Sequence, residues 1–402
     1  MEKTAIPERT QTKNSGVAQT PVPMLDLKRQ YQPLQRELLQ ALGQVLETQQ
    51  FILGEHVAAF ERAAAERLGV KHALGCSSGT DALWLALSGA GIGQGDSVVT
   101  TPFSFFASVS SILRAGATPV LADIDPVTFN LSPAAAEAVL SGERGASVKA
   151  ILPVHLYGQC ADMTAFSRLG RERELAIIED AAQAWGAEWQ GAKAGGLGDA
   201  AAFSFYPTKN LSAAGDAGMV TTNRDDVAER AKMLRNQGMR RRYHHDELGW
   251  NARMDGFQGA VLSVKLKHIG AWNETRCELA ARYGRIFSRA GLAENGPYPA
   301  KGLVLPHQAP GTKHVWHQYV IRVARRDALR EFLTARGIGS EIYYPVPLHL
   351  QEALKPLGYR EGDFPEAERA AREVLALPIF PELHEDEQNA VAVAIADFLS
   401  EQ

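Results

Sequence analysis

Cysteines, long apolar runs and an excess of charge of either sign are all scarce in this sequence. The chain has three cysteines, Cys76, Cys160 and Cys277, which are widely separated and show no CxxC spacing. An odd number of dispersed cysteines argues against a disulfide framework or a zinc site and favours buried thiols in a reducing compartment. No run of about 18 apolar residues is present, and the first residues lack the basic-then-apolar order of a secretory signal. We therefore expect a cytoplasmic protein without a membrane span.

The charges of the chain nearly cancel. Lys and Arg number 42, and Asp and Glu number 46, so the formal net charge is -4. A protein without a basic excess has no electrostatic basis for binding nucleic acid or an anionic membrane. We therefore expect its partners to be small molecules or a second copy of the chain.

The order of the elements predicts an α/β fold. Residues 1–22 are polar without an apolar period, and we expect a disordered lead there. Helical spacing over residues 26–68 predicts two helices. Short β-branched runs then alternate with helical stretches, which predicts a mostly parallel sheet wrapped by helices. These runs lie at residues 97–101, 118–122, 149–154, 175–179, 201–205 and 219–222.

The pattern changes after about residue 260, which predicts a second domain. A helical stretch at 261–289 is followed by a strand at 318–323, a helix at 327–336, a strand at 341–344 and two closing helices. At 402 residues the chain exceeds what one small core usually holds. We therefore divide it into the lead (1–22), a large α/β domain (23–260) and a smaller C-terminal α+β domain (261–402).

The first candidate motif is a run of small residues, GCSSGTD at 75–81, directly before an apolar helix. The start of a helix offers unpaired N–H groups and the positive end of the helix dipole, which together suit a phosphate. The alternative is an ordinary Ser or Thr N-cap, which accounts for most such stretches.

The second candidate is a pair of carboxylates, Glu179 and Asp180, at the end of an apolar strand. Ligands of parallel α/β sheets bind at the carboxyl ends of strands, so we expect Asp180 to point into a site. A carboxylate there can keep a pyridine nitrogen protonated, because opposite charges at close range favour both ionised forms. The alternative makes Asp180 a helix N-cap and Glu179 a solvated charge.

The third candidate is Lys209, on a loop after another strand, with Pro207 before it and glycines at 215 and 218 after it. A lysine held beside a cofactor loses part of its hydration. This loss lowers its pKa and leaves a neutral amine that can attack an aldehyde. The alternative is one surface lysine among many.

Together the three motifs match the functional groups of pyridoxal 5'-phosphate. The phosphate would take Gly79, Thr80 and Ser204, the pyridine nitrogen would take Asp180, and the aldehyde would take Lys209. We therefore predict a pyridoxal phosphate site without a metal, in which Lys209 is both the covalent anchor and the proton carrier.

With these motifs the chain resembles the fold-type I pyridoxal phosphate proteins, and in particular the DegT/DnrJ/EryC1/StrS sugar aminotransferases. Further family-like stretches are TPFSF at 101–105, PVHLYG at 153–158, GWNARMD at 249–255 and YPVPLH at 344–349. The resemblance implies that Phe105 stacks on the pyridine ring and that Gln183 bonds the ring hydroxyl. It also implies a homodimer with shared active sites, in which Asn251 reaches the phosphate of the neighbouring subunit. Phe105 could instead be a core aromatic, and Asn251 a turn residue.

The resemblance further implies an aminotransferase that moves an amino group from glutamate to a keto group of a nucleotide-linked keto-deoxy sugar. Lys209 argues against the branch of the family in which histidine replaces the lysine for sugar deoxygenation. The segment PTKNL at 207–211, followed by GDAG at 215–218, is more similar to members that aminate C3 than C4. Scattered residues line such sugar pockets, and the candidates here are Tyr31, Tyr343, Tyr344 and His349.

Two other interpretations stay open. The chain could be a non-catalytic pyridoxal phosphate protein with a regulatory role, although it has no helix-turn-helix pattern or basic stripe. It could also be another fold-type I enzyme, such as a lyase or a cysteine desulfurase, although no cysteine is suitably placed for the latter. The presence of both Lys209 and Asp180 favours the aminotransferase.

Overall fold

The computed structural model describes residues 21–401, so the lead predicted at 1–22 lies almost wholly outside the described residues. Val22, the last residue of that lead, is buried. Its N–H donates to Gly337 O at 3.0 Å, and its carbonyl accepts from Gly339 N at 2.8 Å. Val22 therefore belongs to the folded part of the chain, one residue earlier than predicted.

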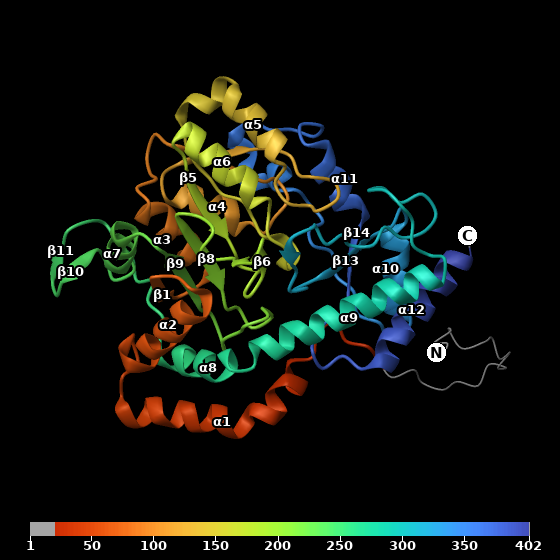
Figure 1. The fold of residues 1–402 in the computed structure, drawn as a ribbon, viewed down its shortest axis with the longest axis horizontal. Helices are drawn as coiled ribbons and strands as arrows, with labels where there is room; N and C mark the ends of the chain where they lie inside the picture. The colour runs from red at the N-terminus through yellow and green to blue at the C-terminus, as the bar shows by residue number, and fades with distance from the viewer. Residues whose placement is uncertain (1–20, 402) are drawn as a thin grey trace.

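Seven strands form the central sheet: β1 (His72–Cys76), β2 (Ser97–Thr100), β3 (Thr118–Leu121), β4 (Val148–Ile151), β5 (Ala176–Asp180), β8 (Ala200–Ser204) and β9 (Gly218–Thr222). Their order is β1-β9-β8-β5-β4-β2-β3 (Figure 1). Strand β9 is antiparallel to both of its neighbours, β1 and β8, and the other neighbouring pairs of this sheet are parallel. The strands are short, apolar and almost entirely buried, as in parallel sheets covered by helices. The predicted mostly parallel α/β sheet is confirmed, although β1 was not among the predicted strands.

Five helices connect and cover these strands: α3 (Gly79–Gly89), α4 (Ala107–Arg114), α5 (Pro133–Ser141), α6 (Met163–Arg173) and α7 (Asp225–Leu234). Helix α3 begins after Ser78, whose Oγ accepts from Asp81 N at 3.1 Å as an N-cap. Its residues 82–87 are all buried, and it packs against β8 and β9. This packing directs the N-terminus of α3 at the end of β8.

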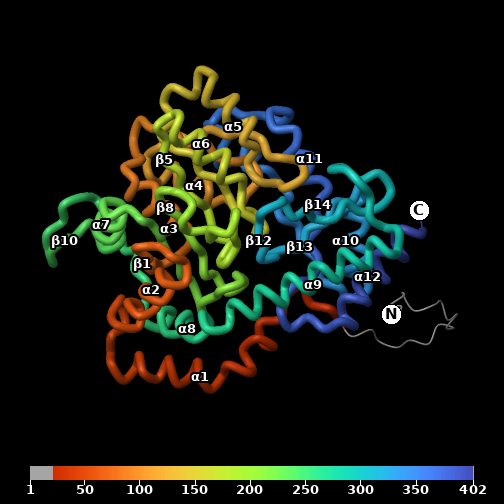
Figure 2. Tube along the Cα trace, viewed as in Figure 1, coloured from red at the N-terminus to blue at the C-terminus, as the bar shows by residue number. Residues whose placement is uncertain are grey.

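The two helices predicted over 26–68 are confirmed as α1 (Leu27–Thr48) and α2 (Gly54–Leu68), which both pack on α8 (Gly256–Leu266). The single helix predicted at 261–289 is wrong, because the chain breaks at Lys267 and His268 before α9 (Ile269–Arg289). Both helices bury an apolar face, so the helical spacing of apolar residues continues through the break. The sequence pattern therefore gives no sign that one helix ends there and another begins. Figure 2 shows that α9 leads from α8 to the C-terminal elements.

The strand predicted at 318–323 is confirmed as β13 (Tyr319–Arg322), which pairs antiparallel with β14 (Val374–Leu377). The strand predicted at 341–344 is wrong. Of these residues, Glu341 alone forms a bridge, and Tyr343 O instead accepts a hydrogen bond from the Tyr157 hydroxyl. The structure has β14 where no strand was predicted, because a short apolar run directly after a helix does not distinguish strand from helix.

The remaining C-terminal helices are α10 (Arg326–Ala335), α11 (Pro365–Glu373) and α12 (Glu385–Ser400). The last two are the predicted closing helices. The division of the chain at residue 260 stays a prediction. Two short β elements lie outside these sheets: a three-stranded sheet of β6 (Glu188–Trp189), β7 (Ala192–Lys193) and β12 (Thr312–Lys313), and a hairpin of β10 (Met239–Arg241) and β11 (His244–His245).

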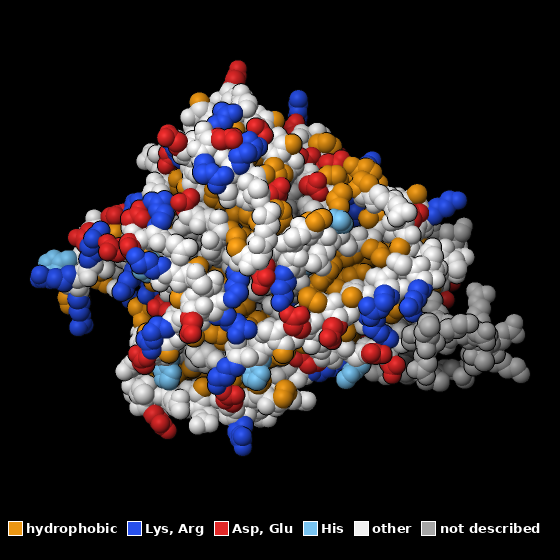
Figure 3. Space-filling view, viewed as in Figure 1, with side chains coloured by type: hydrophobic (Ala, Val, Ile, Leu, Met, Phe, Trp, Pro, Cys, Tyr) orange, Lys and Arg blue, Asp and Glu red, His pale blue; other side chains and the backbone are white. Residues whose placement is uncertain are grey.

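The hairpin projects from the body beside α7, and basic side chains gather over its tip (Figures 1 and 3). Between residues 21 and 401, no helix is both long and apolar enough to cross a membrane. Over the same residues, no group of three or more His, Cys, Asp or Glu side chains could hold a metal ion. Cys76 and Cys160 are buried as expected, and Cys277 is half-buried.

Candidate active site

The three motifs of the sequence meet at the carboxyl edge of the central sheet. Strands β5 and β8 are neighbours, and Asp180 pairs with Ala202 in their register. The loop with Lys209 leaves the end of β8 and returns as β9, closed by a hydrogen bond from Phe205 N to Ala217 O at 2.8 Å. The start of α3 lies directly beside the same end of β8.

Lys209 is half-buried in this loop, and its backbone N–H donates to Tyr206 O at 2.8 Å. Loss of hydration lowers the pKa of its amine from the usual 10.5 to about 8, while the negative charge of Asp180 opposes the shift. Roughly a tenth of such an amine is neutral and nucleophilic at pH 7. Its surroundings thus differ from those of an exposed surface lysine.

Asp180 is 4% exposed and accepts two hydrogen bonds. Ser108 Oγ donates to one carboxylate oxygen at 2.7 Å, and Ala182 N donates to the other at 3.2 Å. Burial raises the pKa of the Asp180 carboxyl, and the two hydrogen bonds and the charge of Lys209 act against this shift. A second cation in front of the carboxylate would stabilise its ionised form further.

Glu179, the neighbour of Asp180, is completely buried. Its carboxylate accepts from the backbone N–H groups of Gly195, Leu197 and Gly198 at 2.8, 2.7 and 2.8 Å, and lies 3.0 Å from Nε2 of His155. The alternative of a solvated charge is therefore wrong for Glu179. Its hydrogen bonds tie the loop after β7 to the end of β5 and so support the position of Asp180.

Glycine at position 79 lets the start of α3 approach β8 closely. A Cβ atom built on Gly79 would lie 2.6 Å from Ser204 Cβ, closer than real carbon atoms come. The first intrahelical hydrogen bond runs from Ala82 N to Ser78 O, so the N–H groups of Gly79 and Thr80 precede it and have no acceptor within the helix. Ser78 is thus an N-cap, which was the alternative interpretation of this motif. The helix start still offers the N–H groups of Gly79 and Thr80 as free donors beside the Ser204 hydroxyl.

A pair of aromatic residues and one amide complete the site. Gln183 accepts from Tyr157 N at 2.6 Å and donates to the Tyr344 hydroxyl at 3.1 Å, so the C-terminal segment reaches the central sheet here. Phe105 is 60% exposed, with its ring centroid 6.4 Å from that of Tyr344. The alternative of a core aromatic is therefore wrong for Phe105.

Residues 32–396 match the model of the DegT/DnrJ/EryC1/StrS aminotransferase family. The chain belongs to this family. The fold expected from the sequence and the aminotransferase activity class are therefore confirmed, and the site described above is that of a family member.

Relatives of the chain within the DegT/DnrJ/EryC1/StrS family cover nearly its whole length. It is 48% identical over 377 residues to the pleiotropic regulatory protein of Geobacillus stearothermophilus, with 94% of this chain and 98% of that protein covered. It is 42% identical over 385 residues to dTDP-3-amino-3,4,6-trideoxy-alpha-D-glucose transaminase of Streptomyces venezuelae, with 96% of this chain and 98% of that protein covered. Its fold is similar to the crystal structure of NtdA from Bacillus subtilis with bound cofactor PMP, with a TM-score of 0.85, 29% identity, and 97% of this chain and 87% of that chain covered.

Three residues that the sequence suggested for the site make no described contact with the residues around Lys209. Tyr31 is exposed on α1. Asn251 is exposed and forms a backbone bridge with Asn236 rather than a turn. His349 is 1% exposed, and its Nε2 lies 3.0 Å from a carboxylate oxygen of Glu368. Their roles in binding stay predictions.

The sequence analysis missed three residues that support the site. His155 and Tyr157 stand in the PVHLYG stretch shortly after β4. Ligands of parallel sheets bind at the carboxyl ends of strands, and this rule, which indicated Asp180, could have indicated both residues as well. Ser108 lies on α4, where no local pattern marks it as the partner of Asp180. Only the packing of α4 against the sheet brings its hydroxyl to the carboxylate.

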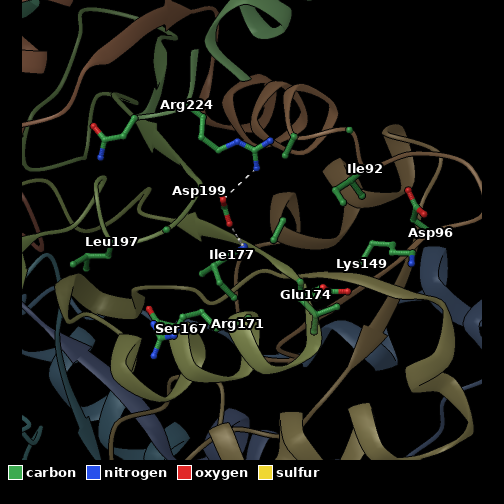
Figure 4. Close-up of a pocket in the computed structure, with 17 residues that line it drawn as sticks. Ile92, Asp96, Lys149, Ser167, Arg171, Glu174, Ile177, Leu197, Asp199 and Arg224 are labelled. Carbon is green, nitrogen blue, oxygen red and sulfur yellow. Dashed lines mark hydrogen bonds and ion pairs between the residues drawn. The ribbon is translucent and has the colours of Figure 1, made fainter. Parts of the chain in front are cut away.

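A separate open cavity of about 720 Å³ lies at the opposite, amino edge of the sheet (Figure 4). Lys149 at the start of β4, Arg171 on α6 and Arg224 before α7 line it, and Arg224 pairs with Asp199 at 3.2 Å. It contains none of the residues predicted to bind the cofactor or the substrate. Since Asp180 and Lys209 lie at the carboxyl edge, this cavity is not part of the candidate active site.

Proposed function

We propose that the chain is a pyridoxal 5'-phosphate-dependent aminotransferase that moves an amino group from glutamate to a keto group, at C3, of a nucleotide-linked keto-deoxy sugar. Its main support is the pairing of Lys209, an amine with a lowered pKa, with the buried Asp180 at the end of the adjacent strand. An aldehyde and a protonated pyridine nitrogen require these two groups. The PMP in the similar NtdA structure supports the choice of cofactor.

In this proposal the start of α3 holds the cofactor phosphate. The free N–H groups of Gly79 and Thr80, the hydroxyls of Thr80 and Ser204, and the positive end of the helix dipole all favour an anion there. The close approach of Gly79 to β8 brings these donors together. A larger residue at position 79 would push them apart.

The ring of the cofactor would lie between Asp180, Gln183 and Phe105. Asp180 would pair with the protonated pyridine nitrogen, which offsets the cost of burying the carboxylate. Gln183 would bond the ring hydroxyl, and its amide is already oriented by Tyr157 and Tyr344. The exposed ring of Phe105 would lose its contact with water on stacking.

When bound, pyridoxal phosphate supplies an electron sink that makes the α-proton of an amino acid acidic. Lys209 would hold the aldehyde end of the cofactor, and its amine would take and return a proton during the reaction. A pKa near 8 suits both directions, because neither the amine nor the ammonium form is scarce near neutral pH. Hydrogen bonds from Ser108 and Ala182 help to keep Asp180 ionised and facing the ring.

The substrate class follows from the family and its relatives. A transaminase whose name includes a dTDP-3-amino sugar is 42% identical to this chain, which supports a nucleotide-linked sugar and amination at C3. The segment after Lys209 favours C3 as well. The hydrogen bond between Tyr344 and Gln183 supports Tyr344 as a sugar-binding residue, and Tyr31, Tyr343 and His349 are further candidates.

A second copy of the chain would complete the site. Large apolar side chains near the start of α3 and in the segment before Asn251 are exposed, among them Tyr206 (53%), Leu248 (84%) and Trp250 (48%). The guanidinium of Arg114 lies 5.4 Å from the Trp250 ring centroid and bonds Asp81 on α3, so Trp250 is close to the phosphate cradle. An exposed apolar surface beside an active site favours a homodimer, with Asn251 reaching the phosphate of its partner.

Reduction with borohydride tests the proposed function directly. The purified protein should show the visible absorbance of bound pyridoxal phosphate, and reduction should fix the cofactor to the peptide that contains Lys209. Lys209→Ala should abolish this trapping, whereas substitution of the exposed Lys149 should leave it intact. Trapping that survives the Lys209 substitution would contradict the assignment of the anchor.

Glutamate should then bleach the absorbance, and the loaded enzyme should aminate 3-keto nucleotide sugars in preference to 4-keto sugars. A spectrum that responds to neither glutamate nor glutamine would favour the regulatory or lyase interpretation. Preference for a 4-keto sugar would contradict the assignment of C3 alone.

A further inference from the structure

Two buried hydroxyls stand behind the carboxylate of Asp180. Ser104 precedes α4, Ser108 lies in the first turn of this helix, and both side chains are buried. Their Oγ atoms are 2.8 Å apart, and Ser108 Oγ lies 2.7 Å from Oδ2 of Asp180. The three side chains therefore form one continuous hydrogen-bonded chain, in which Ser108 connects Ser104 to the carboxylate.

Each hydroxyl has one proton to donate, and this limits the direction of the chain. If Asp180 is ionised, its carboxylate can only accept, so Ser108 donates to it. Ser108 then has no proton left for Ser104, and Ser104 must donate to Ser108. In this direction every hydroxyl proton of the chain has an acceptor.

The opposite direction leaves a buried proton without an acceptor. A protonated Oδ2 of Asp180 would donate to Ser108, Ser108 would donate to Ser104, and Ser104 would need an acceptor of its own. Within the described part of the chain, Ser104 Oγ has no hydrogen-bond partner other than Ser108. A proton on Oδ1 would lack an acceptor as well, since the described partner of this oxygen is the N–H group of Ala182. A buried donor without an acceptor is costly, so the two serines favour the ionised carboxylate.

Three titratable side chains on other elements also act on Asp180. Lys209 on the loop after β8 and His155 after β4 favour its ionised form, and Tyr344 is the third such group. Among residues 21–401, none of these three side chains forms a hydrogen bond with the carboxylate. The direct contacts of the carboxylate are thus the Ser108 hydroxyl and the N–H group of Ala182.

We propose that Ser104 is a positioning residue for Asp180: it donates to Ser108, Ser108 donates to the carboxylate, and the two hydroxyls in this order keep Asp180 ionised and oriented. This role rests on the proposed function, in which Asp180 faces the pyridine nitrogen. Hydrogen bonds in a chain polarise one another, so the donation by Ser104 makes Ser108 a stronger donor. The same turn carries Phe105, whose carbonyl accepts from Ser108 N at 3.1 Å. One turn of the chain therefore supports both the acid and the aromatic residue proposed to stack on the ring.

Removal of one hydroxyl at a time tests the order of the chain. Ser108→Ala deletes the direct donor and should raise the pKa of the Asp180 carboxyl by about one unit, a tenfold change in the ratio of its two forms. Ser104→Ala leaves Ser108 able to donate and should raise this pKa by about half a unit, roughly threefold. Ser111→Ala is the matched control, because this serine is buried on the same helix and its Oγ has no hydrogen-bond partner among the described residues.

Urea unfolding of the full-length, cofactor-free protein measures these shifts without the cofactor. Deprotonation of Asp180 costs more free energy in the fold of a variant in which its pKa is higher. The loss of stability against the wild type should therefore grow as the pH rises through this pKa. Between about pH 4 and 8 the unfolding constant relative to the wild type should rise about tenfold in Ser108→Ala and about threefold in Ser104→Ala. In an Asp180→Asn background this dependence on pH should vanish.

The affinity for pyridoxal phosphate, measured by absorbance titration, reports the same shifts in the loaded protein. A protonated Asp180 must lose its proton before it can pair with the protonated pyridine nitrogen, so the affinity should fall below the pKa of this carboxyl. The fall should begin about one unit higher in Ser108→Ala and about half a unit higher in Ser104→Ala. The cofactor phosphate titrates alike in every variant, so the ratio of each affinity to that of the wild type isolates Asp180.

A Ser104→Ala shift no larger than that of Ser111→Ala would overturn the proposal, and so would a loss of stability that is equal at every pH or that keeps its pH dependence in the Asp180→Asn background. If Ser104→Ala does not fold, Ser104→Cys decides, because a thiol is a weak donor and should produce part of the shift. A Ser104→Cys protein that matches the wild type in both measurements would then overturn the proposal. Failure of the proposed function is distinguishable, because pyridoxal phosphate would not bind while urea unfolding would still report the effect of Ser104 on Asp180.

Discussion

Replacing Lys209 by methionine is expected to stabilise the cofactor-free protein at neutral pH. The pKa of this lysine is about 8 in the folded chain against 10.5 for the free side chain, a difference of 10.5 - 8 = 2.5 units. At about 1.4 kcal/mol per unit, keeping the lysine protonated in the fold costs at most about 3.5 kcal/mol. Because the side chain is half-buried, water screens part of this cost, and we expect a gain of about 1–2 kcal/mol.

The sign of the effect follows from the protons bound in each state. Between pH 8 and 10.5 the unfolded chain binds more protons at this position than the folded chain does. The destabilisation by Lys209 is therefore complete below pH 8, fades through this window and is absent above pH 10.5, where the amine is neutral in both states. Methionine has a similar length and no charge, so the advantage of the variant should decline over the same window.

Urea unfolding of the cofactor-free protein at about pH 7, 8 and 10 measures this advantage. The exposed Lys149 gives the matched control, and Lys149→Met should show no advantage that depends on pH in this window. Equal stability of Lys209→Met and the wild type at pH 7 would refute the claim that Lys209 is desolvated in the fold. An advantage that persists undiminished at pH 10 would refute it as well.

Three further substitutions test the rest of the site. Gly79→Ala should weaken the binding of pyridoxal phosphate at least ~10-fold in an absorbance titration, because the new methyl group would lie 2.6 Å from Ser204 Cβ. Gly43→Ala is the control: its methyl group would lie in open space, so the affinity should not change. Glu179→Gln should lower the free energy of unfolding by about 2–4 kcal/mol in urea titrations, because an amide cannot accept all the buried hydrogen bonds that the carboxylate accepts; an unchanged midpoint would show that this carboxylate is dispensable. Phe105→Ala should weaken cofactor binding about 10-fold and leave the melting temperature of the cofactor-free chain unchanged, since the ring is 60% exposed; a lower melting temperature would mean that the ring belongs to the core.

The sequence was sufficient to indicate that Gly79, Asp180 and Lys209 share one site. Asp180 and Lys209 each follow a predicted strand, and parallel strands bring their carboxyl ends to the same edge of a sheet. Gly79 stands at the start of a predicted helix, where a phosphate can bind. The α/β architecture followed from the alternation of short apolar runs and helical stretches, and the structure confirms it. Local patterns failed where two elements share one pattern, as in the unbroken periodicity across α8 and α9.

Only the tertiary structure decided what surrounds these residues. Ser108 bonds Asp180 from 72 positions away, Glu179 is enclosed by backbone donors, and His349 lies against Glu368. The hydrogen-bonded side chains of Asn210, Asn273 and His317 come from three separate segments of the chain. The physical reason is that the spacing of apolar residues along the sequence indicates which face of a helix or strand a side chain occupies. Its partner depends instead on the paths of the loops and on helix packing, which form only when distant parts of the chain come together.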